Sequence, residues 1–234
     1  MSDAAEPGPT MGRLSFRLPR ASGNDLEPYD GPLGVGDDRD GVLYIPDTAE
    51  KKAPLLVFFH GATGTGRREL RAIVAAADRF GVVVLAPDAR STQSWDIIAN
   101  GGFGPDVEFL DKALASVVDR CAVDTARIAV GGISDGASYA LSLGLSNGDV
   151  FEAVVAFSPG FVVPLAPTGK PRLFFSHGTS DPILPIDMCS RPITQGLHDA
   201  GYDVTYLEFD GGHTVPPPIS DRGLQWWVEG PKAP

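Results

Sequence analysis

Short apolar runs recur along most of this chain, and most of them are continuous rather than alternating with polar residues. They cover residues 42–45, 55–59, 82–86, 128–130, 153–157, 172–175 and 204–209. Continuous runs of this length are typical of strands that are buried on both faces of a parallel sheet. This pattern constrains the fold more than any other feature of the sequence.

The segments between these runs have the spacing of helices. Residues 67–80, 105–120, 137–146 and 187–200 carry apolar residues at helical period, and a last helix is predicted over 221–230, with Trp226 and Trp227 packed on the sheet. Strands that alternate with helices predict an α/β fold with a doubly wound, mostly parallel sheet and right-handed crossovers. Ligands bind such sheets at the carboxyl ends of the strands.

The chain of 234 residues is long enough for one complete α/β domain. Residues 1–40 are rich in Gly, Pro, Asp and Ser, and we predict a loop-rich N-terminal extension there, with one possible edge strand over the alternating residues 14–18. Residues 41–234 contain no internal repeat and no linker, so they are predicted to form a single domain.

The net charge of −11 disfavours a nucleic-acid partner, because the field of the protein would repel a polyanion. Two cysteines, Cys121 and Cys189, are too few for a disulfide framework and do not have metal-ligand spacing. Whether they pair stays open. The first residues do not have the pattern of a secretory signal, and no apolar run reaches 18 residues. These features favour a cytoplasmic protein that does not associate with membranes.

The most specific motif is the pentapeptide Gly132-Ile133-Ser134-Asp135-Gly136, which lies between a predicted strand and a predicted helix. A G-x-S-x-G sequence in that context is typical of a nucleophile elbow, a turn so tight that the residues beside the serine must be small. Ser134 is therefore the candidate nucleophile. The backbone N–H of Asp135, at the start of the helix, is a candidate donor to an oxyanion.

A serine hydroxyl needs a base, and the base needs an orienting acid. His213 follows the last predicted strand on a glycine-bearing loop, which favours it as the base; His198 is predicted to be an exposed helix residue, and His60 and His177 are predicted to be structural. Asp181 follows the preceding strand and is the candidate acid. Its rival Asp187 is better placed to cap a helix.

The loop 59–66 follows an early strand and contains three glycines, which would let its backbone approach a substrate closely. It lacks the lysine and hydroxyl residue of a phosphate-binding loop and the spacing of a dinucleotide fingerprint. We therefore predict that the protein uses no cofactor and no metal, and that this loop supplies the second oxyanion donor.

Four blocks, at 60–64, 132–136, 177–185 and 212–214, occur in the order found in one family. With them the chain resembles the small, lidless serine esterases of the α/β-hydrolase superfamily, in the phospholipase/carboxylesterase and polyhydroxybutyrate-depolymerase-like branch. The resemblance implies an α/β-hydrolase fold without a large lid, and it implies that the catalytic residues are Ser134, Asp181 and His213. It also implies that the N–H groups of Ala62 and Asp135 form the oxyanion hole.

Two departures from the family bear on the substrate. Exported members carry signal peptides and additional disulfides, which weakens a polymer-degrading role for this chain. The run Thr214-Val215-Pro216-Pro217-Pro218 after the base would form a stiff wall and narrow the pocket.

The function predicted from these residues is that of a serine carboxylesterase, which hydrolyses small carboxylic esters through an acyl-serine intermediate. Trp95, Phe103 and Phe161 lie in loops after predicted strands, where they would line the substrate pocket or pack on the core. Alternatives are a thioesterase or peptidase with the same triad, or a non-catalytic binding protein that kept the fold. The oligomeric state stays open.

Overall fold

The computed structural model describes residues 8–19, 23, 26–36 and 38–230. Its centre is an eight-stranded sheet with the order β1-β2-β4-β3-β5-β6-β7-β8. The six strands from β4 to β8 in this order are parallel, and β1 and β2 are antiparallel at one edge. The mostly parallel sheet predicted from the apolar runs is therefore confirmed. The strands are β1 (Tyr29–Pro32), β2 (Gly41–Ile45), β3 (Ala53–Phe59), β4 (Val83–Pro87), β5 (Val123–Ile133), β6 (Ala153–Phe157), β7 (Arg172–Gly178) and β8 (Val204–Phe209).

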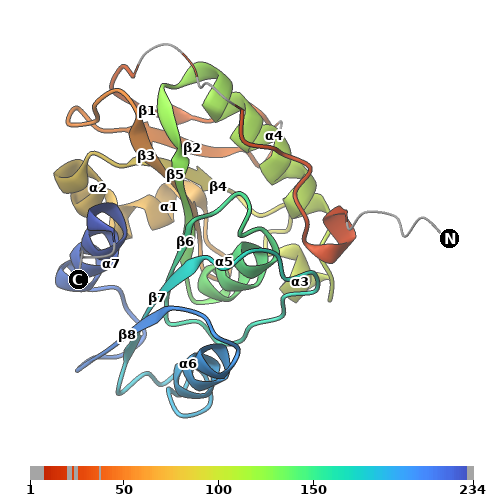
Figure 1. Ribbon diagram of the computed structural model, residues 1–234, viewed down its shortest axis with the longest axis vertical. Coiled ribbons are helices and arrows are strands. Elements are labelled where there is room, and N and C mark those ends of the chain that lie inside the picture. The colour runs from red at the N-terminus through yellow and green to blue at the C-terminus, as the bar shows by residue number, and fades with distance from the viewer. Residues whose placement is uncertain (1–7, 20–22, 24–25, 37, 231–234) are drawn as a thin grey trace, which may run out of the picture.

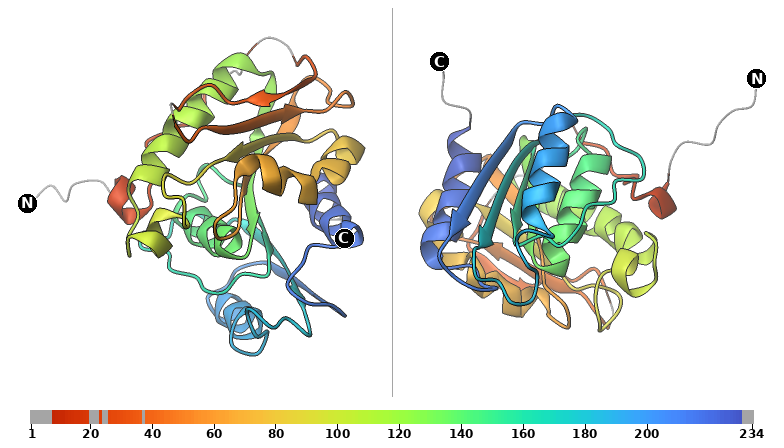
Figure 2. Two further views of the ribbon diagram at one scale, coloured as in Figure 1. Left: turned by 180° about the vertical axis from the view of Figure 1, so that it is seen from behind. Right: turned by 90° about the horizontal axis from the view of Figure 1, so that it is seen from below.

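Helices cover both faces of the sheet, as Figures 1 and 2 show, with α2 and α7 on one face and α4, α5 and α6 on the other. The helices are α1 (Gly66–Glu69), α2 (Val74–Phe80), α3 (Asp96–Ala99), α4 (Pro105–Arg120), α5 (Asp135–Ser146), α6 (Ser190–Asp199) and α7 (Pro217–Glu229), with 3-10 turns η1 (Pro9–Met11) and η2 (Leu70–Ala72). In the part of the chain that the structure describes, no helix combines the length and apolar character needed to cross a membrane.

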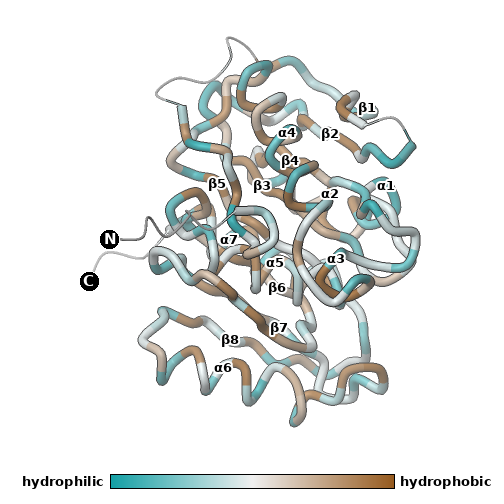
Figure 3. Tube along the Cα trace, turned by 90° about the vertical axis from the view of Figure 1, so that its right-hand side faces the viewer, coloured by the Kyte–Doolittle hydropathy of each residue, from teal (hydrophilic) through white to brown (hydrophobic). Residues whose placement is uncertain are grey.

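The central strands carry apolar residues on both sides because each face has its own core. Every residue of β3, β4 and β6 is buried. Side chains of α4, α5 and α6 form one apolar cluster with the sheet, and those of α2 and α7 form the other. Figure 3 shows hydrophobic residues along the inner strands and their alternation with hydrophilic residues along α6.

Two predictions in the first half of the chain need correction. Residues 14–18 form no strand, and the edge strand of the N-terminal region is β1 instead. The predicted helix over 67–80 is divided into α1, η2 and α2, because Ile73 is fully buried with a non-helical backbone. Short local patterns could not show either outcome, since both depend on which side chains the sheet buries.

The N-terminal segment is attached to the far end of α5. Arg13 forms two hydrogen bonds with the carboxylate of Asp149, at 2.7 and 2.9 Å. The side chain of Asn147 accepts the N–H of Leu14 at 2.9 Å and donates to the carbonyl of Gly12 at 2.7 Å. These bonds hold residues 12–14 against the core, where the Leu14 side chain is buried.

The sheet brings several distant loops to one edge. Gly132 pairs with Phe59, Ile133 pairs with Phe157, and Gly178 pairs with Phe209. Because these strands are parallel, the residues that follow their carboxyl ends lie at the same edge. Cys121 and Cys189 are both buried and free, so they do not form a disulfide in this structure.

Candidate active site

Ser134 occupies the turn between β5 and α5 in a strained conformation. Its φ is 58° and its ψ is −123°, and its side chain does not cap the helix that begins at the next residue. Its N–H donates to the carbonyl of Phe157 on β6 at 3.0 Å. A positive φ is costly for a residue with a Cβ, and such strain concentrates at functional sites. The turn therefore has the backbone expected of a nucleophile elbow.

The glycines of the pentapeptide are required by close approaches of the backbone. A Cβ on Gly136 would lie 2.3 Å from the carbonyl oxygen of Phe59 and 2.5 Å from that of His60. A Cβ on Gly61 would lie 3.4 Å from the Cβ of Ser134, so the loop after β3 passes directly beside the candidate nucleophile. The carbonyl oxygens of Phe59 and His60 therefore leave no room for a side chain at position 136.

Asp181 and His213, from the loops after β7 and β8, form a direct contact. His213 Nδ1 lies 2.6 Å from Asp181 Oδ2. The other carboxylate oxygen accepts the backbone N–H groups of Ile183 and Leu184, each at 2.9 Å. The carboxylate accepts through Oδ2, so Nδ1 of the neutral ring carries the proton and Nε2 is left as a base.

The environment keeps the acid ionised. Burial by itself would raise the pKa of Asp181, but the hydrogen bonds from Leu184, His213 and Ile183 outweigh it and hold the pKa below its ordinary value. The Asp181 side chain is fully buried, whereas the His213 side chain is 18% exposed. A buried anion beside a partly exposed imidazole is an arrangement that can stabilise an imidazolium.

The structure brings His213 and Asp181 into contact but leaves Ser134 without a hydrogen bond to His213 among the described residues. Catalytic hydrogen bonds are often long in structures without substrate. Asp187, the rival acid, is exposed and forms a surface ion pair with Arg191 at 2.5 Å. It has no contact with the imidazole of His213 in the described part of the chain.

The loop after β3 presents its backbone toward the same region. Thr63 N–H donates to Gln93 O at 2.7 Å and Gly64 N–H donates to Gly61 O at 3.0 Å, while the N–H of Ala62 donates to none of the residues that the structure describes. The N–H of Asp135 is at the first position of α5 and has no partner within that helix. These two donors stay a prediction for the oxyanion hole.

The predicted pocket residues differ in position. Trp95 and Phe103 are 2% and 5% exposed and belong to the core. The indole N–H of Trp95 donates to His60 O at 2.8 Å, and its ring is stacked on Tyr139. Both side chains pack on the core, as the packing alternative predicts, and a pocket role for them stays a prediction. Phe161 is half-buried and keeps its predicted pocket role, in a segment whose amides at 160 and 161 donate to the Ser138 hydroxyl.

A second serine near the elbow was missed in the sequence. Ser158 follows β6, has a φ of 53° and is buried. Its N–H donates to Ser176 O at 2.8 Å, and its hydroxyl has no hydrogen-bond partner among the described residues. No sequence pattern distinguishes this strained serine from an ordinary strand end.

The sequence also does not reveal a pair of buried carboxyl groups, which belong to Asp96, the first residue of α3, and Asp106, in the first turn of α4. The two residues are 1% and 3% exposed. Each accepts a backbone N–H from the other, Asp106 N to Asp96 Oδ2 at 3.0 Å and Asp96 N to Asp106 Oδ2 at 2.6 Å. Burial and the neighbouring Asp106 raise the pKa of Asp96 to about 6. The pair fixes the loop between β4 and α4.

We expect Asp96→Asn to stabilise the fold at pH 8. The raised pKa means that the folded state binds a proton between about pH 4 and 6 that the unfolded state has released, so wild-type stability falls as the pH rises through this range. Asparagine removes this loss, which we expect to be worth about 3 kcal/mol at pH 8 for a pKa raised from 3.8 to about 6. Urea unfolding at pH 4, 6 and 8 measures it, with the exposed Asp119→Asn as control. A variant less stable than wild type at pH 8 would contradict the expectation.

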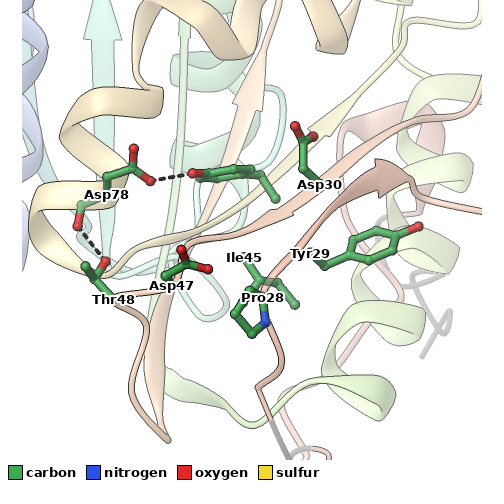
Figure 4. Close-up of a pocket in the computed structure, with 8 residues that line it drawn as sticks. Pro28, Tyr29, Asp30, Ile45, Asp47, Thr48 and Asp78 are labelled. Atoms are coloured by element: carbon green, nitrogen blue, oxygen red, sulfur yellow. Dashed lines mark hydrogen bonds between the residues drawn. The ribbon is translucent and has the colours of Figure 1, made fainter.

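Two other parts of the molecule bear on ligand binding. In the described residues, no three His, Cys, Asp or Glu side chains are grouped so that they could hold a metal ion. A separate pocket of about 420 Å³ lies beside β1 and β2 (Figure 4). Two of the three acids that line it have protein partners, since Asp30 pairs with Arg67 and Asp78 accepts from Tyr44. Tyr44 pairs with Val84 near the start of β4, away from the carboxyl edge of the sheet.

Comparison with solved structures identifies the fold. Esterase PE8 superimposes with a TM-score of 0.67 and 23% identity, over 82% of this chain and 99% of that one. The carboxylesterase of Bacillus cereus superimposes with a TM-score of 0.64 and 20% identity, over 83% of this chain and 95% of that one. The chain has the α/β-hydrolase fold. Its structural neighbours include esterases and other serine hydrolases.

Part of this α/β-hydrolase-fold protein is similar in sequence to a known enzyme. The S-formylglutathione hydrolase of Bos taurus is 30% identical to it over 142 residues. That match spans half of this chain and half of the bovine enzyme. No family model matches the sequence.

Proposed function

We propose that this α/β-hydrolase-fold protein is a serine carboxylesterase that acts on small esters through an acyl-serine intermediate. The observation that carries the proposal is the Asp181–His213 contact of 2.6 Å at the sheet edge where a serine is held at a φ of 58°. Such a positive φ is costly for a residue with a Cβ, and strain of this kind concentrates at functional sites. The esterases among its structural neighbours support the same reaction class.

In the proposed reaction, His213 Nε2 takes the proton of the Ser134 hydroxyl while the serine oxygen attacks the ester carbonyl. The oxyanion that forms is stabilised by the N–H groups of Ala62 and Asp135. His213 then gives its proton to the leaving alcohol. In the second half of the reaction, His213 takes a proton from water, the water oxygen attacks the acyl carbonyl, and the proton returns to the Ser134 oxygen as the carboxylic acid leaves. Asp181 holds the imidazole in the required tautomer throughout.

A thioester is the second candidate substrate. It is favoured by the S-formylglutathione hydrolase match, whose named substrate is a thioester. The same three side chains would act, with a thiolate in place of the alkoxide as leaving group. Rates on an oxygen ester and a thioester with one common acyl group distinguish the two proposals. A thioester rate at least tenfold higher would favour the second.

Labelling with a fluorophosphonate tests the proposed nucleophile. We expect one labelled peptide, which contains Ser134, because only a serine activated by a base reacts readily with such a reagent. Mass spectrometry of the digested protein identifies the position. Labelling of another serine, or no labelling of active protein, would refute the assignment.

The pH profile tests the proposed base. We expect kcat/KM to have an acidic midpoint and to fall tenfold per pH unit below it, because a protonated ring cannot accept the serine proton. Asp181 does not cause this decline, since its lowered pKa keeps it ionised there. Initial rates from pH 4.5 to 9 measure the profile. A flat profile down to pH 5 would exclude histidine as the base.

A further inference from the structure

His177, on β7, is fully buried and both of its ring nitrogens have partners. Nε2 lies 2.8 Å from the carbonyl oxygen of Leu184 and 3.1 Å from Asp181 Oδ2. Nδ1 contacts the hydroxyl of Ser190, the first residue of α6, which is also fully buried. A histidine that only filled the core would need no more than the Ser190 and Leu184 contacts.

The partners determine where the protons lie. A carbonyl oxygen only accepts hydrogen bonds, so Nε2 of His177 carries a hydrogen that it donates to Leu184 O. The same N–H group lies 3.1 Å from Asp181 Oδ2 without a hydrogen bond to it. In the neutral ring, Nδ1 then accepts the hydrogen of the Ser190 hydroxyl. Ser190 therefore selects the tautomer in which the N–H group of His177 lies beside the acid.

Two histidine N–H groups thus lie against one carboxylate oxygen, of which that of His213 is hydrogen-bonded to it. His213 Nδ1 approaches Asp181 Oδ2 at 2.6 Å and His177 Nε2 approaches it at 3.1 Å, while Oδ1 is occupied by backbone N–H groups. We infer that His177 is a positioning residue, which fixes the rotation of the Asp181 carboxylate and limits how strongly its Oδ2 attracts the imidazolium of His213. This inference rests on the proposed function, in which Asp181 is the acid and His213 the base.

The charged groups around His177 form compensated pairs. Glu208 is its register partner on β8 and is paired with Arg191 of α6 at 2.6 Å. Arg191 also pairs with Asp187. The thiol of Cys189 lies beside the same segment, and burial raises its pKa, so it stays neutral. His213 has its ionic contact with Asp181. These groups are unchanged in the variants below, so a change in titration reports the ring at position 177.

The test compares two variants of His177. His177→Leu removes the N–H group at Nε2, whereas the side-chain amide of His177→Gln reaches the same place and keeps an N–H group there. With the leucine variant we expect kcat/KM to fall a few-fold, because the Asp181 carboxylate loses the polar N–H group that lies against its Oδ2. We also expect its acidic midpoint to move up by about half a pH unit, because Oδ2 without this N–H group beside it holds the imidazolium more strongly. The glutamine variant should keep the wild-type midpoint. His198→Leu, at an exposed histidine of α6, is the matched control.

NMR titration of the His213 ring gives a readout that does not need turnover. The inference expects protonation of His213 at higher pH in His177→Leu, and a smaller shift in the same direction in Ser190→Ala, which loses the tautomer control. A wild-type titration in both variants would overturn it, even if their rates fall. If the leucine variant does not fold, the Ser190→Ala titration decides. A wild-type protein that hydrolyses no ester or thioester would refute the proposed function but leave this titration test valid.

Discussion

Ser134→Ala is expected to lower kcat/KM for a short p-nitrophenyl ester by about 10⁴-fold or more. The members of a triad act as a unit, so that removal of the nucleophile leaves only the contribution of binding and of the oxyanion donors. The change removes one oxygen atom that makes no capping bond to α5, so the fold should be retained. Purified variants, with thermal unfolding as the check on folding, give the measurement.

Ser158→Ala is a matched control for this variant. Ser158 shares the residue type and the positive φ, 53° against 58°, and lies at the end of the adjacent strand. It has no role in the proposed reaction, so its variant should keep activity within a few-fold of wild type. Retained activity in Ser134→Ala, or an equal loss in the two variants, would contradict the proposed nucleophile.

Asp181→Asn is expected to lower kcat by about 10³–10⁴-fold with little change in overall structure. The backbone N–H groups of Ile183 and Leu184 need an acceptor, so the amide oxygen would turn toward them and the NH₂ group would face His213. Nδ1 of His213 would then accept a hydrogen bond, and the ring proton would move to Nε2. An imidazole protonated at Nε2 cannot accept the serine proton.

Asp187→Asn separates the two candidate acids. Asp187 is exposed and paired with Arg191, so its variant should have nearly wild-type kcat. If kcat fell strongly in Asp187→Asn and only slightly in Asp181→Asn, Asp187 rather than Asp181 would be the acid. Steady-state rates are compared at a pH above the acidic midpoint, so that His213 is neutral in both variants.

The fold could be predicted because its evidence is repeated along the chain. Continuous apolar runs mark the buried strands, and helix α4 was predicted with the bounds that the structure has. The elbow could be predicted because the glycine at 136 is imposed by contacts of 2.3 and 2.5 Å that no other residue allows. Such requirements act locally, so they leave a mark in the sequence.

Side-chain positions in loops could not be predicted in the same way. Trp95 is a pocket candidate in the sequence because it follows a strand, but its indole stacks on Tyr139, which lies 44 positions further along the chain in α5. His177 was predicted to be structural, and its contact with Asp181 depends on how the turn after β7 folds back. The buried acids Asp96 and Asp106 look like ordinary surface residues in the sequence. These outcomes depend on tertiary neighbours that a linear pattern does not specify.

The attachment of Arg13 to Asp149 has a consequence for how the chain matures during synthesis. The two residues are 136 positions apart, so the first leaves the ribosome roughly 7 to 27 s before its partner is made. Until then the carboxylate that Arg13 binds is missing, whereas the N–H groups of Ser15 and Phe16 can already bind the carboxylate of Asp111. The Arg13–Asp149 contact must therefore form late, and it lies beyond the end of α5 that is opposite to Ser134.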